Sequence, residues 1–247
     1  MHAARMLVST RQRRRAVTLR PDEIVSGFQQ EMEAFGALVG GLDSTQWATP
    51  SRCEGWTVAD VAAHAIGSVA DVVAGRVEGL GSPEATAREV AERSGRSPAE
   101  LADELAAVSK QISDLAVLFD DDAWAGPAPG DYDGTLAQGV EALFYDTWAH
   151  GDDIRAALGM ASVTESPGLR AALHHLALVL AQQGWGPATL ALDGVEEIEI
   201  AAPADGAAGG AGAGHRITGD PLAFVLVASG RAEPAALGLD ETVNVYR

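Results

Sequence analysis

The sequence predicts an α+β protein in which a four-helix bundle is followed by a small α+β domain. Apolar residues recur every three to four positions through most of the chain up to Gln183, which is typical of amphipathic helices. After Gly184 the chain changes to short strand-like runs around a segment of almost pure alanine and glycine. The length of 247 residues and the hydrophobic content of 47% suit two modest domains. We expect a basic, disordered arm over residues 1–21, the helical bundle over 22–183 and the α+β domain over 184–247.

The helices of the bundle follow from the spacing of their apolar residues. The stripes predict helices over residues 21–42, from 57 to about 75–81, over 98–119 and over 135–158, with a further helix over 167–183. Thr57 is a good N-cap for the second helix because Asp60 follows three residues later. Four amphipathic helices with one or two long connections are typical of a four-helix bundle, which builds metal sites from inward side chains on facing helices.

The last part of the chain is predicted to combine strands with one short helix. Strands are expected over residues 189–192, 196–201 and 215–218, a helix over 221–229 and a closing strand over 242–246. The alanine- and glycine-rich segment 204–214 is interpreted as a flexible hairpin tip. A phosphate-binding loop would join a strand to a helix and would usually be followed by a lysine, whereas this segment lies between two predicted strands and no lysine follows it.

Composition limits the partners and the location of the protein. No apolar run approaches the roughly 18 residues of a membrane span, and the arginines near the start are not followed by an export signal's apolar region, so we expect a cytoplasmic protein that binds no membrane. The net charge of −18 makes nucleic acid a poor partner. The first 20 residues carry six arginines and no acid, and this arm is the one segment suited to phosphate or an acidic surface.

The residues that carry chemistry are a few histidines and carboxylates. Cys53 is the single cysteine, so any metal must be held by histidine and carboxylate. Asp146 and His150 are four residues apart and share one helix face, while His64 lies on another helix. Two imidazoles and one carboxylate are a common set for a divalent cation. A packed histidine and a simple surface pair explain the same spacing, so the residues alone leave both interpretations open.

Two longer stretches resemble the mycothiol-dependent maleylpyruvate isomerase family, whose members have a DinB-like helical bundle. The first runs from Trp47 through Cys53-Glu54-Gly55-Trp56-Thr57-Val58 to His64. The second is Asp146-Thr147-Trp148-Ala149-His150-Gly151-Asp152-Asp153-Ile154, similar to the Glu-x-x-x-His segment of the family. The resemblance runs from about residue 22 to the end, where Ser229-Gly230-Arg231 matches a Gly-Arg helix end.

The resemblance implies a site and an activity. His64, Asp146 and His150 match the three metal ligands, with zinc expected first, although aspartate stands where the family usually has glutamate. Arg231 matches an arginine that is expected to bind a substrate carboxylate. The alternative interpretation is that Gly230-Arg231 only caps the end of a helix. The implied cosubstrate is the low-molecular-weight thiol mycothiol. Its thiolate would add to an electrophilic small molecule, giving isomerisation or S-transfer.

Two other functions remain open at this stage. One is a non-catalytic helical-bundle binding or regulatory protein with a structural metal or none, for which the acidic surface is suitable. The other is metal-dependent hydrolysis, with Asp60 and Asp153 as candidate bases about one turn from a ligand. His174 and His175 are expected to stay off the metal together, because adjacent helical residues point about 100° apart. The substrate and the oligomeric state have no signal in the sequence.

Overall fold

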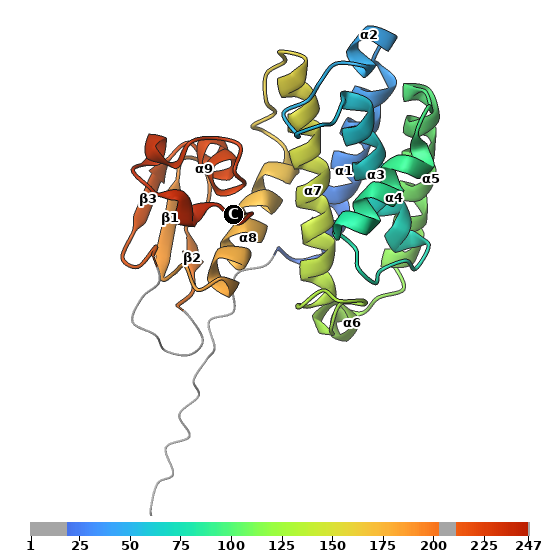
Figure 1. The fold of residues 1–247 in the computed structure, drawn as a ribbon. Coiled ribbons are helices and arrows are strands. Elements are labelled where there is room, and N and C mark those ends of the chain that lie inside the picture. The colour runs from blue at the N-terminus through green and yellow to red at the C-terminus, as the bar shows by residue number, and fades with distance from the viewer. Residues whose placement is uncertain (1–18, 203–210, 247) are drawn as a thin grey trace, which may run out of the picture.

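The computed structural model describes residues 19–202 and 211–246 and confirms the α+β fold class (Figure 1). Its first part is helical, and a small three-stranded sheet follows near the end of the chain. Most of the predicted basic arm and part of the predicted hairpin tip, residues 1–18 and 203–210, lie outside the described residues. None of the helices in the described ranges is long and apolar enough to cross a membrane.

Four long helices surround the first hydrophobic core. They are α1 (Pro21–Gly40), α3 (Val58–Val73), α5 (Pro98–Ala116) and α7 (Leu136–Ala157). Both α1 and α3 pack against α5 and α7, so the four helices enclose a common interior. Fully buried residues from each helix fill this interior: Phe28, Phe35, Ile66, Leu101, Leu105 and Phe144.

The starts of these helices are fixed by local hydrogen bonds that the sequence encodes. Thr57 accepts from the backbone N–H of Asp60 while the Asp60 carboxylate accepts from the N–H of Thr57, which is the predicted capping box. Thr135 and Gln138 form the same reciprocal pair before α7. A cap of this kind contributes about 1 kcal/mol, so the site-bearing helices begin at defined residues.

Three α-helices in the described part of the chain were not expected from the sequence. Two are short, α2 (Ser44–Trp47) and α6 (Asp121–Ala125), and the third is α4 (Pro83–Arg93), which packs on α3. The buried residues of α4 are Ala85, Glu89 and Arg93, so it has no apolar stripe to reveal it. The sequence feature that could have revealed α4 is its start, where Ser82 caps the helix and Pro83 occupies the first helical position.

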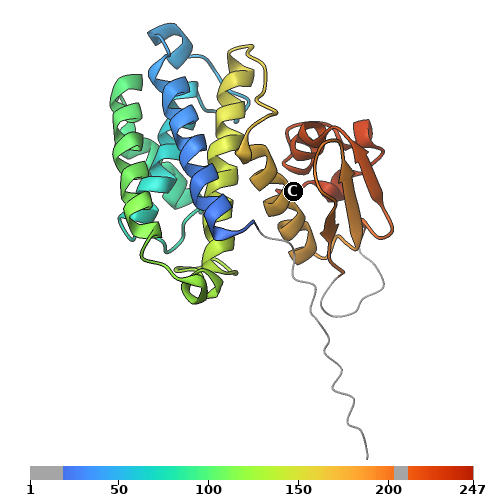
Figure 2. The ribbon, with the colours of Figure 1, turned by 180° about the vertical axis from the view of Figure 1, so that it is seen from behind.

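A second core lies between α8 (Pro167–Gln182), α9 (Pro221–Ala228) and the sheet. The strands are β1 (Ala188–Leu192), β2 (Ile198–Ile200) and β3 (Arg216–Gly219), in the order β2-β1-β3. Leu190 at the centre of β1 pairs with Ile198 in the antiparallel direction and with Ile217 in the parallel direction. Figures 1 and 2 show α8 between α7 and the strands, and Trp148 of α7 belongs to this second core.

The predicted closing strand over 242–246 is wrong. Residues Glu241–Val243 form a 3₁₀ helix, η2, which follows another, η1 (Pro234–Leu237). Asp240 caps η2 by accepting from the N–H of Thr242, and this local bond competes with an extended backbone. The valines that looked like strand residues instead enter the second core, and Val245 donates its N–H to the carbonyl of Ala228 at the end of α9.

Candidate metal centre

The structure brings His64, Asp146 and His150 together between α3 and α7. One donor atom from each residue can be chosen so that the three lie within 4.8 Å of one another. The Nε2 atom of His150 is 3.3 Å from Asp146 Oδ1, and the Nε2 atom of His64 is 3.9 Å from Asp146 Oδ2. The two imidazole rings meet edge to face with centroids 4.9 Å apart. Both Nε2 atoms are therefore directed at the same carboxylate.

A buried acidic residue that the sequence analysis did not anticipate orients His64. Glu89 of α4 is fully buried, and its Oε2 atom lies 2.7 Å from His64 Nδ1. Because this oxygen accepts a hydrogen bond, the ring proton belongs on Nδ1 and the lone pair on Nε2. Ser68 Oγ donates to the same oxygen at 3.3 Å. A Cβ atom at Gly67 would lie 2.6 Å from Glu89 Cβ, so glycine at this position allows α4 to approach α3.

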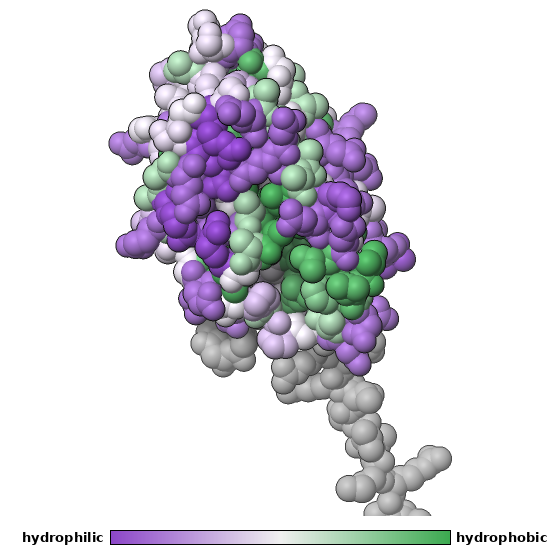
Figure 3. Space-filling model, turned by 90° about the vertical axis from the view of Figure 1, so that its right-hand side faces the viewer, coloured by the Kyte–Doolittle hydropathy of each residue, from purple (hydrophilic) through white to green (hydrophobic). Residues whose placement is uncertain are grey.

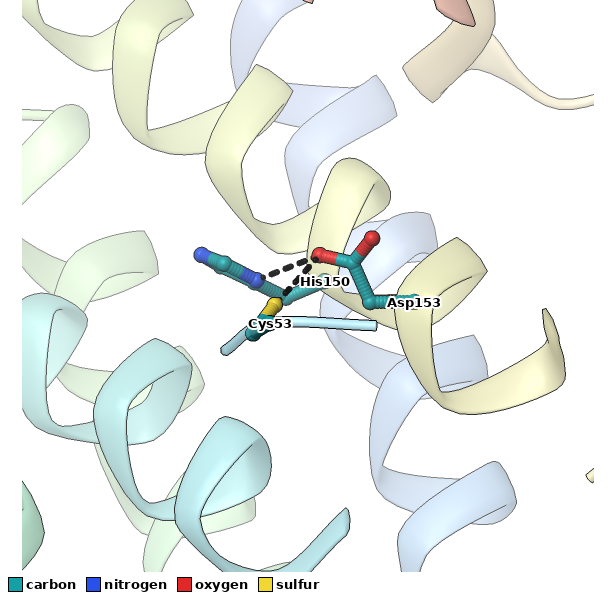
Figure 4. Close-up of side chains that lie close together, drawn as sticks. All are labelled: Cys53, His150 and Asp153. Atoms are coloured by element: carbon teal, nitrogen blue, oxygen red, sulfur yellow. Dashed lines mark hydrogen bonds and ion pairs between the residues drawn. The ribbon is translucent and has the colours of Figure 1, made fainter. Parts of the chain in front are cut away.

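His150 has the same kind of partner on its own helix. Asp153 Oδ2 lies 2.9 Å from His150 Nδ1, and the Sγ atom of Cys53 donates to the same oxygen at 3.4 Å (Figure 4). The hydrogen bond at Nδ1 again directs Nε2 toward Asp146. A carboxyl group on the far nitrogen is the usual arrangement of a metal-binding histidine. Cys53, His150 and Asp153 are also close enough to form a second candidate cation group.

Two arginines hold Asp153 in place. Arg231, which follows α9, donates from Nε to Oδ1 at 2.8 Å and from Nη2 to Oδ2 at 2.7 Å. Arg52 donates from Nε to Asp153 Oδ1 at 2.5 Å and from Nη2 to Asp152 Oδ2 at 2.6 Å. Arg231 thus lies two hydrogen bonds from His150, near the centre, and its third nitrogen, Nη1, donates to the carbonyl of Ser229 at 3.4 Å. Its expected contact with a substrate carboxylate stays a prediction.

The charges of the centre are coupled. Burial lowers the pKa of His150, but the negative charge of Asp146 and the hydrogen bonds that the ring donates to Asp146 and Asp153 outweigh burial and raise that pKa well above its usual value. Burial raises the pKa of Asp146, but the charge and hydrogen bond of His150 hold it at about 2. Burial likewise opposes ionisation of Asp153, and the hydrogen bonds from Arg231 and His150 keep its pKa far below the ordinary range. Both aspartates are ionised at neutral pH.

The other candidates of the sequence analysis are occupied elsewhere. His175 stacks on Tyr145 with ring centroids 4.8 Å apart, and burial lowers its pKa to about 4. Neither His174 nor His175 belongs to a group of potential metal ligands among the described residues. Asp60 uses its Oδ2 atom for the cap at Thr57. Asp60 and Asp153, the candidate bases for hydrolysis, are both engaged in structural hydrogen bonds.

The sequence is similar to a protein-family model and to two proteins of known sequence. The sequence model of the mycothiol maleylpyruvate isomerase N-terminal domain matches residues 28–155. Two uncharacterized proteins of Mycobacterium tuberculosis, from strains CDC 1551 / Oshkosh and ATCC 25618 / H37Rv, are each 28% identical over 157 residues, or 57% of this chain. The match spans 58% of the length of each of these relatives.

Solved structures agree with the fold. A crystal structure of the mycothiol-dependent maleylpyruvate isomerase and one of a mutant with a histidine replaced by alanine each match with a TM-score of 0.56 and 21% sequence identity. The match covers 87% of this chain and 90% of that enzyme. At this level of identity the likeness concerns the fold.

Proposed function

Since the chain belongs to the mycothiol maleylpyruvate isomerase N-terminal domain family, we propose that it is a metal-dependent enzyme that uses mycothiol to attack an electrophilic small molecule. His64, Asp146 and His150 are the proposed metal ligands, and zinc is the proposed metal. The observation that carries the proposal is the orientation of the histidines. Each has its Nδ1 atom against a fully buried carboxyl group, of Glu89 or Asp153, and its Nε2 atom toward Asp146.

The donor geometry fits a small divalent cation. Two donors that each lie about 2.1 Å from one ion are at most about 4.2 Å apart. The separations of 3.3 Å and 3.9 Å from the histidine Nε2 atoms to Asp146 are within this limit. The Asp146 side chain is 31% exposed, whereas each histidine side chain is 11% exposed. The site is therefore open to solvent beside Asp146, where a small molecule has access.

A divalent cation bound there would supply the positive charge that lowers a thiol's pKa, so that the thiolate forms near neutral pH. The residues around it orient the proposed ligands. Glu89 and Asp153 hold the ring protons on Nδ1, and Arg52 and Arg231 hold Asp153 ionised. These contacts restrict both imidazole rings to one orientation before any ligand arrives.

The proposed reaction begins with addition of the mycothiol sulfur. The thiolate forms a bond to an electrophilic carbon, and the electron pair of the attacked double bond moves onto its activating carbonyl group. If rotation follows and the thiolate leaves, the product is an isomer; if the carbanion takes a proton instead, the thioether remains. The proposed nucleophile is external because Cys53, the single cysteine, has its Sγ atom hydrogen-bonded to Asp153 at 3.4 Å.

Aspartate in place of the usual glutamate is compatible with this proposal. Asp146 is one methylene shorter, yet its two oxygens reach toward both histidines in the structure. Aspartate is itself a common zinc ligand. We therefore treat Asp146 as a ligand.

The test measures metal and thiol chemistry on the same preparations. Purified protein should contain about one zinc, and it should accelerate the reaction of mycothiol with a neutral fluorogenic electrophile such as monochlorobimane, or a cis-to-trans isomerisation of a maleyl compound. His150→Ala should lose metal and both activities while its circular dichroism stays helical. His215→Ala, an exposed histidine beside Trp185, is the matched control and should change neither. Full activity of metal-free His150→Ala would overturn the proposal, and metal binding by a wild-type protein inert toward every thiol and electrophile would favour the binding protein.

A further inference from the structure

A small apolar cavity lies between α7, the end of α3 and two loops, and its lining on α7 ends about one helical turn before Asp146. Its volume is about 260 Å³, close to the lower end of the range for small-molecule sites. The apolar side chains that line it are only half-buried, so they remain accessible from the cavity: Val72, Val77, Leu80, Leu136, Val140 and Leu143. Tyr132 adds an aromatic face. The cavity therefore offers a mainly apolar surface to a ligand.

The cavity continues the face of α7 that carries the metal ligands. Gly139, Leu143, Asp146 and His150 are spaced by four, three and four residues, so they form one stripe along this helix. Leu143 lines the cavity and lies about one helical turn, roughly 5 Å along the axis, from Asp146. On α3, Val72 lies about two turns beyond His64. His64, Asp146 and His150 do not line the cavity themselves, and Leu143 is the lining residue of α7 that lies nearest to Asp146 in the chain.

The walls of the cavity are formed before any ligand binds. The N–H of Gly79 donates to Asp131 Oδ2 at 3.1 Å and ties the two loops together. Tyr132 donates its hydroxyl proton to the carbonyl of Gln138 at 3.1 Å, so its polar atom is already satisfied. Gly130 has φ of +71° and would collide with the backbone of Val77 if it carried a side chain. A preformed cavity of this kind lowers the ordering cost of binding.

The charges around the cavity exclude an anionic occupant. No lysine or arginine is among its lining residues, and Asp131 and Asp133 lie on its exposed rim. The nearest cations at the metal centre, Arg52 and Arg231, are both paired with Asp153. With the whole chain at −18, a carboxylate placed here would meet repulsion and no partner.

We propose that this cavity binds an uncharged, largely apolar small molecule, the electrophile of the reaction proposed above, with its reactive end toward Asp146. That the bound molecule is the electrophile rests on the proposed function. The apolar lining, the preformed walls and the absence of a lining cation select a neutral ligand over a dicarboxylate. Maleylpyruvate carries two carboxylates, so the preferred substrate of this chain differs in charge from the compound in the relative's name.

Two fluorescent probes that differ by one charge test the binding claim without turnover. N-phenyl-1-naphthylamine is neutral, and 8-anilino-1-naphthalenesulfonate is its sulfonated analogue. The neutral probe should bind with a Kd at least tenfold lower, with and without zinc. Val140→Trp on α7 and Leu80→Trp in the loop after α3 each place a large side chain in the cavity and should each weaken binding of the neutral probe at least tenfold. Val117→Trp is the matched control at an 80% exposed position outside the cavity lining and should bind normally. Equal or tighter binding of the sulfonate, or unchanged binding by both folded cavity variants, overturns the inference.

Turnover separates this inference from the proposed function. With mycothiol as the thiol, kcat/KM is measured for dimethyl maleate and for maleate. Each value is divided by the rate constant of the uncatalysed reaction of the same compound with mycothiol. The ester should be favoured at least tenfold, and Val140→Trp should raise its KM with little change in metal content. A preference for maleate would overturn the inference, leave the thiol chemistry intact and assign Arg231 to the substrate carboxylate. Neutral-probe binding in the cavity of a protein that turns over neither compound would instead overturn the proposed function and support a neutral-ligand site.

Discussion

Replacing Glu89 by glutamine should weaken zinc binding although Glu89 is not a proposed ligand. Glu89 Oε2 lies 2.7 Å from His64 Nδ1, in a position with no solvent exposure. Glutamine keeps the shape and retains one oxygen that can accept the Nδ1 proton. It removes the negative charge and introduces an NH₂ group that needs an acceptor, where Ser68 is already a donor to this carboxyl group.

The expected magnitude follows from this environment. Loss of a carboxylate behind a metal-bound histidine typically costs 10- to 100-fold in metal affinity. Because glutamine preserves the tautomer of His64, we expect about a tenfold increase in the zinc Kd for Glu89→Gln, or about 1.4 kcal/mol. Glu89→Ala also releases the imidazole ring and should approach the upper end of that range, about 100-fold.

The assay is competition for zinc against a fluorescent chelator, with the fold checked by circular dichroism. Glu92→Gln is the control, because Glu92 lies on the same helix α4 but its side chain is 47% exposed and faces surface arginines. It should leave the Kd unchanged, since exposed pairs contribute little. If both Glu89→Gln and Glu89→Ala bind zinc with the wild-type Kd, Glu89 does not orient a metal ligand. The argument that buried carboxyl groups at Nδ1 mark His64 and His150 as ligands would then fail.

Three further predictions concern other residues. Asp146→Glu should retain zinc with a Kd within about tenfold of the wild type, because both carboxylates are zinc ligands; loss of metal, measured by chelator competition, would show that the backbone is fitted to aspartate. Cys53→Ser should keep most thiol-transfer activity in a kinetic assay, since its Sγ atom contacts Asp153, and inactivity with intact metal would make Cys53 the nucleophile. Burial raises the pKa of Glu141 from 4.5 to about 8, so the folded chain retains a proton that the unfolded chain releases between these values, and the free energy of unfolding falls as the pH rises through this window. Glu141→Gln should therefore gain stability relative to the wild type at pH 8 and not at pH 4 in urea titrations; parallel curves at both pH values would contradict the assignment.

The helices that carry the candidate ligands were predictable because their signals are local. Thr57 with Asp60 and Thr135 with Gln138 fix the starts of α3 and α7 by hydrogen bonds within four residues. The prediction failed at Val243, where alternating valines suggest a strand. There the local hydrogen bond from the N–H of Thr242 to Asp240 and the packing of both valines into the second core decide the conformation.

The candidate site was predictable only in part. The i, i+4 spacing of Asp146 and His150 is visible in the sequence, and the resemblance added His64. Glu89 could not be found this way, because its helix has no apolar stripe and its role depends on the close approach of α4 to α3 at Gly67. The pairing of Arg231 with Asp153 joins residues 78 positions apart and likewise depends on how the chain folds.

X-ray absorption at the zinc edge reports the atoms bound to the metal before and after the thiol is added, and so distinguishes activation of an external thiol from other roles of the metal. Zinc-loaded protein should have only nitrogen and oxygen neighbours, at about 2.0–2.2 Å, and mycothiol should add one sulfur at about 2.3 Å. Cys53→Ser should give the same two spectra. A sulfur neighbour before mycothiol is added would place Cys53 on the metal, and a spectrum unchanged by saturating mycothiol would contradict activation of an external thiol at this centre.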